Sequence, residues 1–128
     1  MAKYKIVYTD DLPEGVGGRC EAPIIPMIGT CVIKIRPKYK DDIGLLKHEI
    51  KHSEQYSKCF FHGLMYNFFR DYRLECELDA YKCQIDTYGY TTIGQAMWIV
   101  NALYNKYNLD MSIEDLTAEV KSLLIRKG

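Results

Sequence analysis

The chain has 128 residues, which is enough for one domain with a single buried core. Hydrophobic residues make up 48% of it and charged residues 27%, as in globular rather than disordered proteins. The 17 basic and 17 acidic side chains cancel, so the net charge gives no reason to expect nucleic acid or an anionic membrane as a partner.

The first 37 residues predict a small β-sheet, because they are rich in β-branched residues, glycine and proline. Residues 3–8 (KYKIVY) alternate as a strand does, and residues 10–18 (DDLPEGVGG) form a loop. The segment 22–26 (APIIP) is extended but a poor central strand. Residues 30–36 (TCVIKIR) are the best strand candidate, and their half-polar alternation indicates an outer strand with one wet face.

Two helices are predicted in the middle of the chain. The first runs from about residue 43 to residue 57 and is capped by one of the two aspartates of Asp41–Asp42. Gly63 breaks the helical pattern, and a second, longer helix is expected from about residue 64 to residue 88, with Gly89 as its C-cap.

Two further helices complete the predicted fold. One opens at Thr91 or Thr92 and continues to about Tyr107, and the last opens at Ser112. The sequence therefore predicts an α+β fold, with a small N-terminal sheet of two to three strands followed by about four helices.

The first predicted helix carries the sequence HEIKH, in which His48 and His52 are four residues apart. On a helix this spacing places both imidazoles on one face, about 6 Å apart along the axis, where they can bind one Zn²⁺. Glu49 leans toward the same ion without being forced to bind it. A carboxylate in that place can accept a proton from water, so we expect Glu49 to be a general base.

A catalytic zinc ion needs a third protein ligand, and the second predicted helix offers three acids. Glu75 and Asp79 share a helix face because they are four residues apart, whereas Glu77 points roughly 200° away from Glu75. We therefore expect Glu75 to be the third ligand and Glu77 not to share the ion. Asp79 is expected to accept a hydrogen bond from the far nitrogen of His48.

The motif HEIKH followed by ECELDAY resembles the glutamate-ligand branch of the zincin metallopeptidases, and small phage and bacterial metallopeptidases in particular. The resemblance covers about forty residues, 43–83, and Leu78 departs from it where alanine is usual. It implies that residues 1–128 form a single, minimal zincin-like domain. Carried over by position, it implies zinc ligands at His48, His52 and Glu75, a general base at Glu49 and an orienting residue at Asp79.

The function predicted from these residues is that of a zinc-dependent hydrolase, most simply a peptidase acting on a protein or peptide. The resemblance also implies that the strand 30–36 pairs with an extended substrate. The alternative is a non-catalytic zincin-like module that binds metal or a partner protein, and a third possibility is a helical protein without metal. The hydrolase prediction requires the carboxyl group of Glu75 to lie beside the two imidazoles. The sequence leaves the oligomeric state open.

The N-terminal residues contain no apolar signal core, and no run approaches the length of a membrane span. The five cysteines are odd in number and form no CxxC pair, which favours reduced, mostly buried thiols. We therefore expect a cytoplasmic protein that binds neither membranes nor nucleic acid.

Three further residues are predicted to have structural or solvent-exposed positions and no role in the site. His62 lies near the predicted turn between the two site helices, where a solvated histidine is expected. Trp98 is expected in the core with its apolar neighbours. Arg36 belongs to a short basic cluster that is expected to be the solvated end of a strand.

Overall fold

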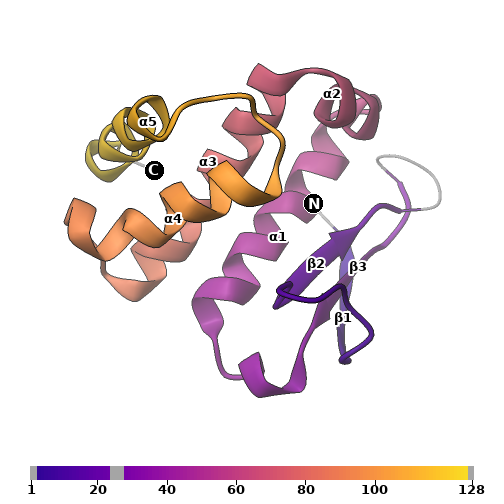
Figure 1. Ribbon diagram of the computed structural model, residues 1–128. Coiled ribbons are helices and arrows are strands. Elements are labelled where there is room, and N and C mark those ends of the chain that lie inside the picture. Colours follow the sequence, from indigo (N-terminus) through magenta and orange to yellow (C-terminus); the bar gives the residue numbers. More distant parts are fainter. Residues whose placement is uncertain (1–2, 24–27, 127–128) are drawn as a thin grey trace.

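The computed structural model describes residues 3–23 and 28–126, which form a three-stranded sheet followed by five α-helices (Figure 1). The predicted α+β fold is confirmed. The strands are β1 (Tyr4–Tyr8), β2 (Gly18–Glu21) and β3 (Cys31–Ile35). A short 3₁₀ helix, η1 (Pro37–Tyr39), leads from the sheet to the helices.

The strand order is β1-β3-β2, so β3 is the central strand. It pairs in parallel with β1 and in antiparallel fashion with β2. The prediction that the strand at 30–36 is an outer strand is therefore wrong. Its alternation has another cause: Cys31, Ile33 and Ile35 are buried on one face, whereas Val32 and Lys34 are half-buried on the other. β2 corresponds to no strand predicted from the sequence, and most of the extended segment 22–26 lies outside the described residues.

Arg36 holds the loop between β1 and β2 in place. Its guanidinium group donates hydrogen bonds to the carbonyl oxygens of Val16 (2.7 Å), Leu12 (3.0 Å) and Pro13 (2.8 Å). It also contacts the carboxylate of Asp10 at 3.3 Å. Arg36 is thus a structural residue that satisfies loop carbonyls, not the solvated end of a strand.

Helix α1 (Ile43–Lys58) begins where it was predicted, since the side chain of Asp42 accepts a hydrogen bond from the Leu45 N–H at 3.0 Å. The long helix predicted at 64–88 is instead two helices, α2 (His62–Phe68) and α3 (Arg70–Tyr88). They are separated at Phe69, whose backbone is extended (φ −117°, ψ 108°).

The break between α2 and α3 leaves carbonyl groups at the end of α2 without helical partners, and Arg73 of α3 binds them. Its guanidinium group donates to the carbonyl oxygens of Tyr66 (2.6 Å) and Asn67 (3.3 Å). It also donates to the carbonyl oxygens of Tyr107 (2.8 Å) and Asn108 (2.9 Å), which follow α4. The break is therefore stabilised by a residue whose other partners lie more than thirty positions away.

Helix α4 (Ile93–Lys106) starts with a capping box in which Thr92 and Gln95 bond each other's backbone N–H groups. Helix α5 (Ile113–Ile125) starts at Ser112, whose side chain accepts from the Asp115 N–H at 3.0 Å. The described residues therefore contain five helices where about four were expected. None of these helices is long and apolar enough to cross a membrane.

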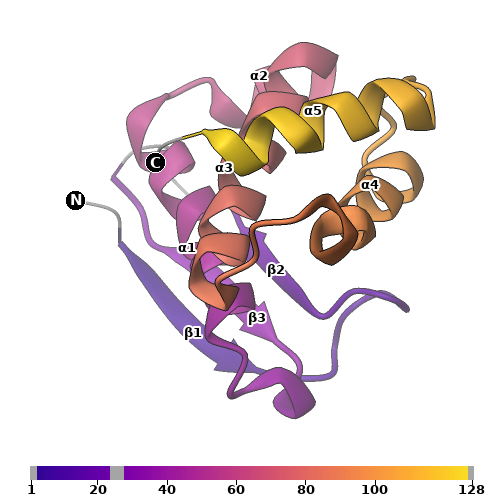
Figure 2. The same cartoon turned by 90° about the vertical axis from the view of Figure 1, so that its left-hand side faces the viewer.

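Helix α1 packs against β2 and β3 on one side and against α3 on the other (Figure 1). Helices α3, α4 and α5 form the main hydrophobic core, and Figure 2 shows β1 and α4 at opposite sides of the molecule. The following residues make up this core: Leu74, Leu78, Tyr81, Ile85, Ala96, Ile99, Val100, Leu103, Leu109, Leu116, Val120 and Leu123. Trp98, predicted for the core, is 36% exposed and lines a cavity instead.

Replacing Gly44 with alanine should destabilise the fold. A Cβ at Gly44 would overlap the ring of Tyr88, which is fixed because its hydroxyl group donates to the Asp42 carboxylate at 2.6 Å. We expect Gly44→Ala to lower the free energy of unfolding by about 1–3 kcal/mol, measured by urea denaturation. The control is Gly94→Ala, because a Cβ there meets only Thr92 Oγ1 at 4.0 Å. Equal stability of the two variants would contradict this account of how α1 and α3 pack.

Candidate metal centre

The interface between α1 and α3 brings together two imidazoles and one carboxylate. His48 and His52 come from α1 and Glu77 from α3, and one ligand atom of each lies within 4.8 Å of the others. The two histidine Nε2 atoms are 3.2 Å apart. The carboxylate oxygens of Glu77 lie 3.5 Å from His48 Nε2 and 3.3 Å from His52 Nε2.

These separations fit a metal ion. Ligand atoms bound at about 2.0–2.1 Å to a tetrahedral zinc ion are about 3.3 Å apart. The separations of 3.2 Å between the two Nε2 atoms and 3.3 Å between His52 Nε2 and Glu77 Oε2 are close to that value, and the other carboxylate oxygen, Oε1, lies 3.5 Å from His48 Nε2. The residues at this point therefore have the chemistry and the spacing of a three-ligand zinc set of two histidines and one glutamate.

The charge at the centre is deeply buried. Glu77 is 2% exposed and His48 is 4% exposed. Burial alone would raise the pKa of Glu77, but His52 and His48 hold it well below its usual range. Burial alone would lower the pKa of His52, but Glu77 raises it to about 9. The carboxylate is therefore ionised and available to a cation.

Two buried polar atoms at the centre have no hydrogen-bond partner among the described residues, namely His48 Nδ1 and Glu77 Oε1. Glu77 Oε1 lies 3.5 Å from His48 Nε2, too far for a good hydrogen bond. A buried acceptor without a partner is costly, and most such atoms in proteins are satisfied by a ligand, an ion or water. A cation between Glu77 and the imidazoles would satisfy Glu77 Oε1.

Gln55, which no pattern in the sequence had singled out, orients His52. The Gln55 Oε1 atom lies 2.9 Å from His52 Nδ1, and Gln55 Nε2 donates to the Cys76 carbonyl oxygen at 2.9 Å. Since Gln55 is held by α3, His52 Nδ1 is the donor, which leaves Nε2 as the atom that binds metal once its proton is released. The available signal was the three-residue spacing between Gln55 and His52 on one helix.

Tyrosines surround the other ligands. The hydroxyl group of Tyr66, on α2, donates a short hydrogen bond to Glu77 Oε2. The ring of Tyr81 meets His48 edge to face at 4.4 Å between centroids, and its hydroxyl group lies 2.9 Å from that of Tyr107. Burial raises the pKa of Tyr81 and of Tyr107, so both remain neutral phenols that can donate hydrogen bonds.

Glu75 and Asp79 do not reach the centre, so the prediction that they are the third ligand and its neighbour is wrong. The Glu75 side chain is 60% exposed and lies 3.9 Å from Arg126. Asp79 accepts from Arg126 at 3.1 Å instead of from His48. Glu75 and Glu77 do point about 200° apart on α3, but the face of α3 that meets α1 carries Glu77 and not Glu75.

His62 is buried, contrary to the prediction of a solvated turn. It is 2% exposed, and its Nδ1 lies 2.8 Å from the Tyr72 hydroxyl group. Burial lowers the pKa of His62 to about 4, so the imidazole is neutral at pH 7. His62 lines the same cavity as the three ligands but does not belong to the ligand group.

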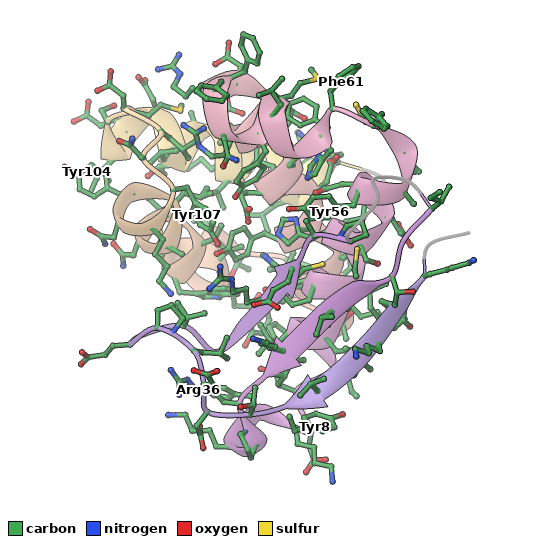
Figure 3. The ribbon with its side chains drawn as sticks, turned by 90° about the vertical axis from the view of Figure 1, so that its right-hand side faces the viewer. Tyr8, Arg36, Tyr56, Phe61, Tyr104 and Tyr107 are labelled. Carbon is green, nitrogen blue, oxygen red and sulfur yellow. The ribbon has the colours of Figure 1, made fainter. Side chains whose placement is uncertain are left out.

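A cavity of about 790 Å³ opens beside the ligands. It lies between β2 with the preceding loop on one side and α4 on the other, and Figure 3 shows Tyr56 and Tyr107, two of its lining residues, on opposite sides of this region. Its volume is typical of a small-molecule or peptide site.

Glu49 lines the same cavity as the three ligands. It is 5% exposed, and its Oε2 atom lies against Gly18 of β2, where an added Cβ would be at 3.4 Å. Burial raises the pKa of Glu49 despite the opposing effect of His48 and His52. A carboxylate with a raised pKa is a better proton acceptor near neutral pH than an exposed one.

No protein-family model, curated protein or solved structure gives a significant match to this chain. The zincin resemblance therefore rests on HEIKH alone, because Glu75 and Asp79 of the second motif face Arg126, and the candidate metal centre rests on the geometry given above.

Exchanging single carboxylates should identify the third ligand. Glu77→Gln removes the charge between the imidazoles, so we expect zinc affinity to fall more than about 100-fold. Glu75→Gln changes an exposed acid on the same helix and should leave zinc affinity unchanged. Both are measured by calorimetric titration of metal-free protein with Zn²⁺. Loss of zinc in Glu75→Gln, with zinc retained in Glu77→Gln, would refute the ligand set.

The metal-free protein should lose stability as the pH rises from 6.5 to 9. The pKa of His52 is raised from 6.5 to about 9. Its protonated form therefore adds stability that is complete below pH 6.5 and is lost as the pH rises through about 9. We expect the melting temperature in chelator to fall over this range, and the fall to be smaller in His52→Gln. An identical fall in that variant would show that another group is responsible.

Proposed function

We propose that this protein is a zinc-dependent hydrolase that cleaves peptide bonds, with Glu77 in the place that the sequence-based prediction required Glu75 to occupy. The observation that supports this most directly is the combination of three buried ligands with a cavity that Glu49 also lines. Catalytic zinc sites have three protein ligands and one open position, and two histidines with one glutamate are such a set. Structural zinc sites have four protein ligands, and the described residues offer no fourth histidine, cysteine or acid to this group.

Each residue of the centre has a definite task in this proposal. A zinc ion held by His48, His52 and Glu77 would lower the pKa of water and polarise a carbonyl group. Glu49 accepts the proton of the attacking water and passes it to the leaving amine. Gln55 keeps His52 in the tautomer that binds metal, and Tyr66 holds the Glu77 carboxylate in place.

The position of β2 suggests how a peptide is bound. The strand at 30–36 cannot pair with a substrate as predicted, because β3 is already paired on both sides. β2 is an edge strand, and Gly18, Arg19 and Cys20 line the cavity. An extended peptide that pairs with the free edge of β2 would pass close to the metal ligands, so the proposed substrate is an unfolded segment of a protein or a peptide.

The free cysteines support a cytoplasmic location as part of the same proposal. All five, Cys20, Cys31, Cys59, Cys76 and Cys83, are unpaired. Burial raises the pKa of Cys20 and raises that of Cys76 to about 11, so these thiols are protonated and unreactive at neutral pH. Such thiols are typical of proteins in a reducing compartment.

Glu49→Gln is the variant that tests the mechanism. The amide has almost the same shape as the carboxylate but cannot accept the proton, so we expect zinc binding to persist and turnover to fall about 10²–10⁴-fold. The assay is cleavage of fluorescently labelled casein by the zinc-loaded protein. Glu54→Gln is the control, because Glu54 lies on the same helix, is 42% exposed at its side chain and pairs only with Lys51.

Two results would count against the proposal. If the Glu49→Gln protein cleaved casein at the original rate, the role of Glu49 would be wrong. If zinc-loaded protein of the natural sequence bound the ion but cleaved neither casein nor a mixture of unstructured peptides, the alternative of a non-catalytic metal-binding module would be favoured.

A further inference from the structure

Helix α2 has its polar and apolar faces reversed with respect to the protein interior. Its polar side chains His62 and Tyr66 point inward, where they bond Tyr72 and Glu77. Its apolar side chains Leu64 and Phe68 are 55% and 74% exposed. A surface helix ordinarily buries its apolar face and exposes its polar one. The arrangement in α2 leaves an apolar surface that the described residues do not cover.

This surface, here called the α2 patch, consists of five large apolar residues. Phe60, Phe61, Leu64, Phe68 and Phe69 are 55%, 60%, 55%, 74% and 58% exposed. The rings of Phe60 and Phe61 contact each other at 5.1 Å between centroids. Taking roughly 200 Å² for a fully exposed side chain of this size, the patch presents about 600 Å² of apolar surface. That is the upper end of what monomeric proteins expose, and such patches mark interaction sites.

The patch also carries no charge. Residues 59–69 (CFFHGLMYNFF) contain no acidic or basic side chain apart from His62. His62 is 2% exposed, and burial lowers its pKa to about 4. A surface without charge neither repels a copy of itself nor selects a partner of opposite charge. Aromatic residues with few charges are typical of the centre of protein–protein interfaces.

We propose that the α2 patch is the interface of a symmetric homodimer. In a two-fold dimer each chain buries the same patch, so about 600 Å² per chain gives a total buried area of about 1,200 Å². This is the lower limit of a specific, stable interface. Phe61, Leu64 and Phe68 follow the i, i+3, i+7 spacing of a helical stripe, so two α2 helices can pack along these residues.

A lipid surface fits the patch less well than a second copy. Helices that lie on membranes combine an apolar face with a face rich in lysine and arginine. The residues that border the patch include Arg70, which pairs with Asp71 at 3.3 Å and donates to the Asp110 carbonyl oxygen at 3.2 Å. The nearby Asp71 side chain is 89% exposed and adds negative charge. With exposed Lys58 at the other end of the patch, these flanking charges sum to only +1, so the border is not a face rich in lysine and arginine.

The dimer would also support the metal centre. Tyr66 bonds Glu77 from the inner face of α2, so fixing the outer face restrains the helix that carries this donor. The dimer itself does not rest on the proposed function, because it follows from the exposed apolar surface alone. A monomer would refute the dimer and leave the hydrolase untouched.

Sedimentation velocity of the full chain tests the proposal. Between about 1 and about 200 µM, we expect the protein to reach twice its chain mass of 14.9 kDa. The double variant Phe61→Ser/Phe68→Ser should raise the dissociation constant at least about 100-fold, because each change occurs twice in a symmetric interface. Tyr104→Ser is the control, since Tyr104 is 51% exposed on α4 and lies elsewhere on the surface (Figure 3).

A second variant guards against misfolding of the first. Leu64→Glu places a charge in the middle of the patch and should also give a monomer, which keeps the far-ultraviolet circular dichroism spectrum of the natural protein and is therefore folded. A protein of the natural sequence that stayed monomeric over the whole range would overturn the proposal. So would a double variant that dimerised as tightly as the natural protein. If the natural protein stayed monomeric and bound phosphatidylcholine vesicles, the patch would be assigned to lipid instead.

Discussion

The contact between α1 and α3 carries a buried carboxylate between two imidazoles, and the rest of the site depends on it. Removing a carboxylate such as Glu77 from water costs several kcal/mol unless opposite charge and hydrogen bonds compensate. Here His48, His52 and Tyr66 compensate in part, while Glu77 Oε1 keeps no hydrogen-bond partner among the described residues. Hydrophobic residues of similar volume would stabilise this interface at least as well. The polar cluster is therefore explained better by the metal ion that it could hold than by stability.

Local signals in the sequence predicted much of the structure. Asp42, Thr92, Ser112 and Gly89 mark helix ends where the structure has them, because a cap is a contact between residues only a few positions apart. The two histidines come together for the same reason, since four residues on one helix fix their geometry. These features needed no knowledge of how distant parts of the chain pack.

The third ligand was predicted wrongly, although the sequence contained the information to choose it. Glu75, Asp79, Lys82 and Asp86 follow a spacing of four, three and four residues, which makes them one charged stripe along α3. In the structure Glu75 and Asp86 of this stripe are exposed, and Lys82 pairs with Asp86 at 3.0 Å. Glu77 is the acid of α3 that lies off the stripe. β2 and the break at Phe69 could not be predicted in this way, because they depend on β3 and on Arg73, whose contacts are distant in sequence.

The reversed faces of α2 follow from its position beside the candidate metal centre. The helix lies beside the site, and its inward positions carry Tyr66, which bonds Glu77, and His62, which lines the cavity. Because polar groups occupy the inward face, α2 gains little free energy from burying apolar surface against its own chain. Its apolar residues point outward instead, and they can stabilise the helix only when something covers them. A second copy of the chain would supply that burial, so the chemistry of the inner face and the association of the outer face have one structural origin.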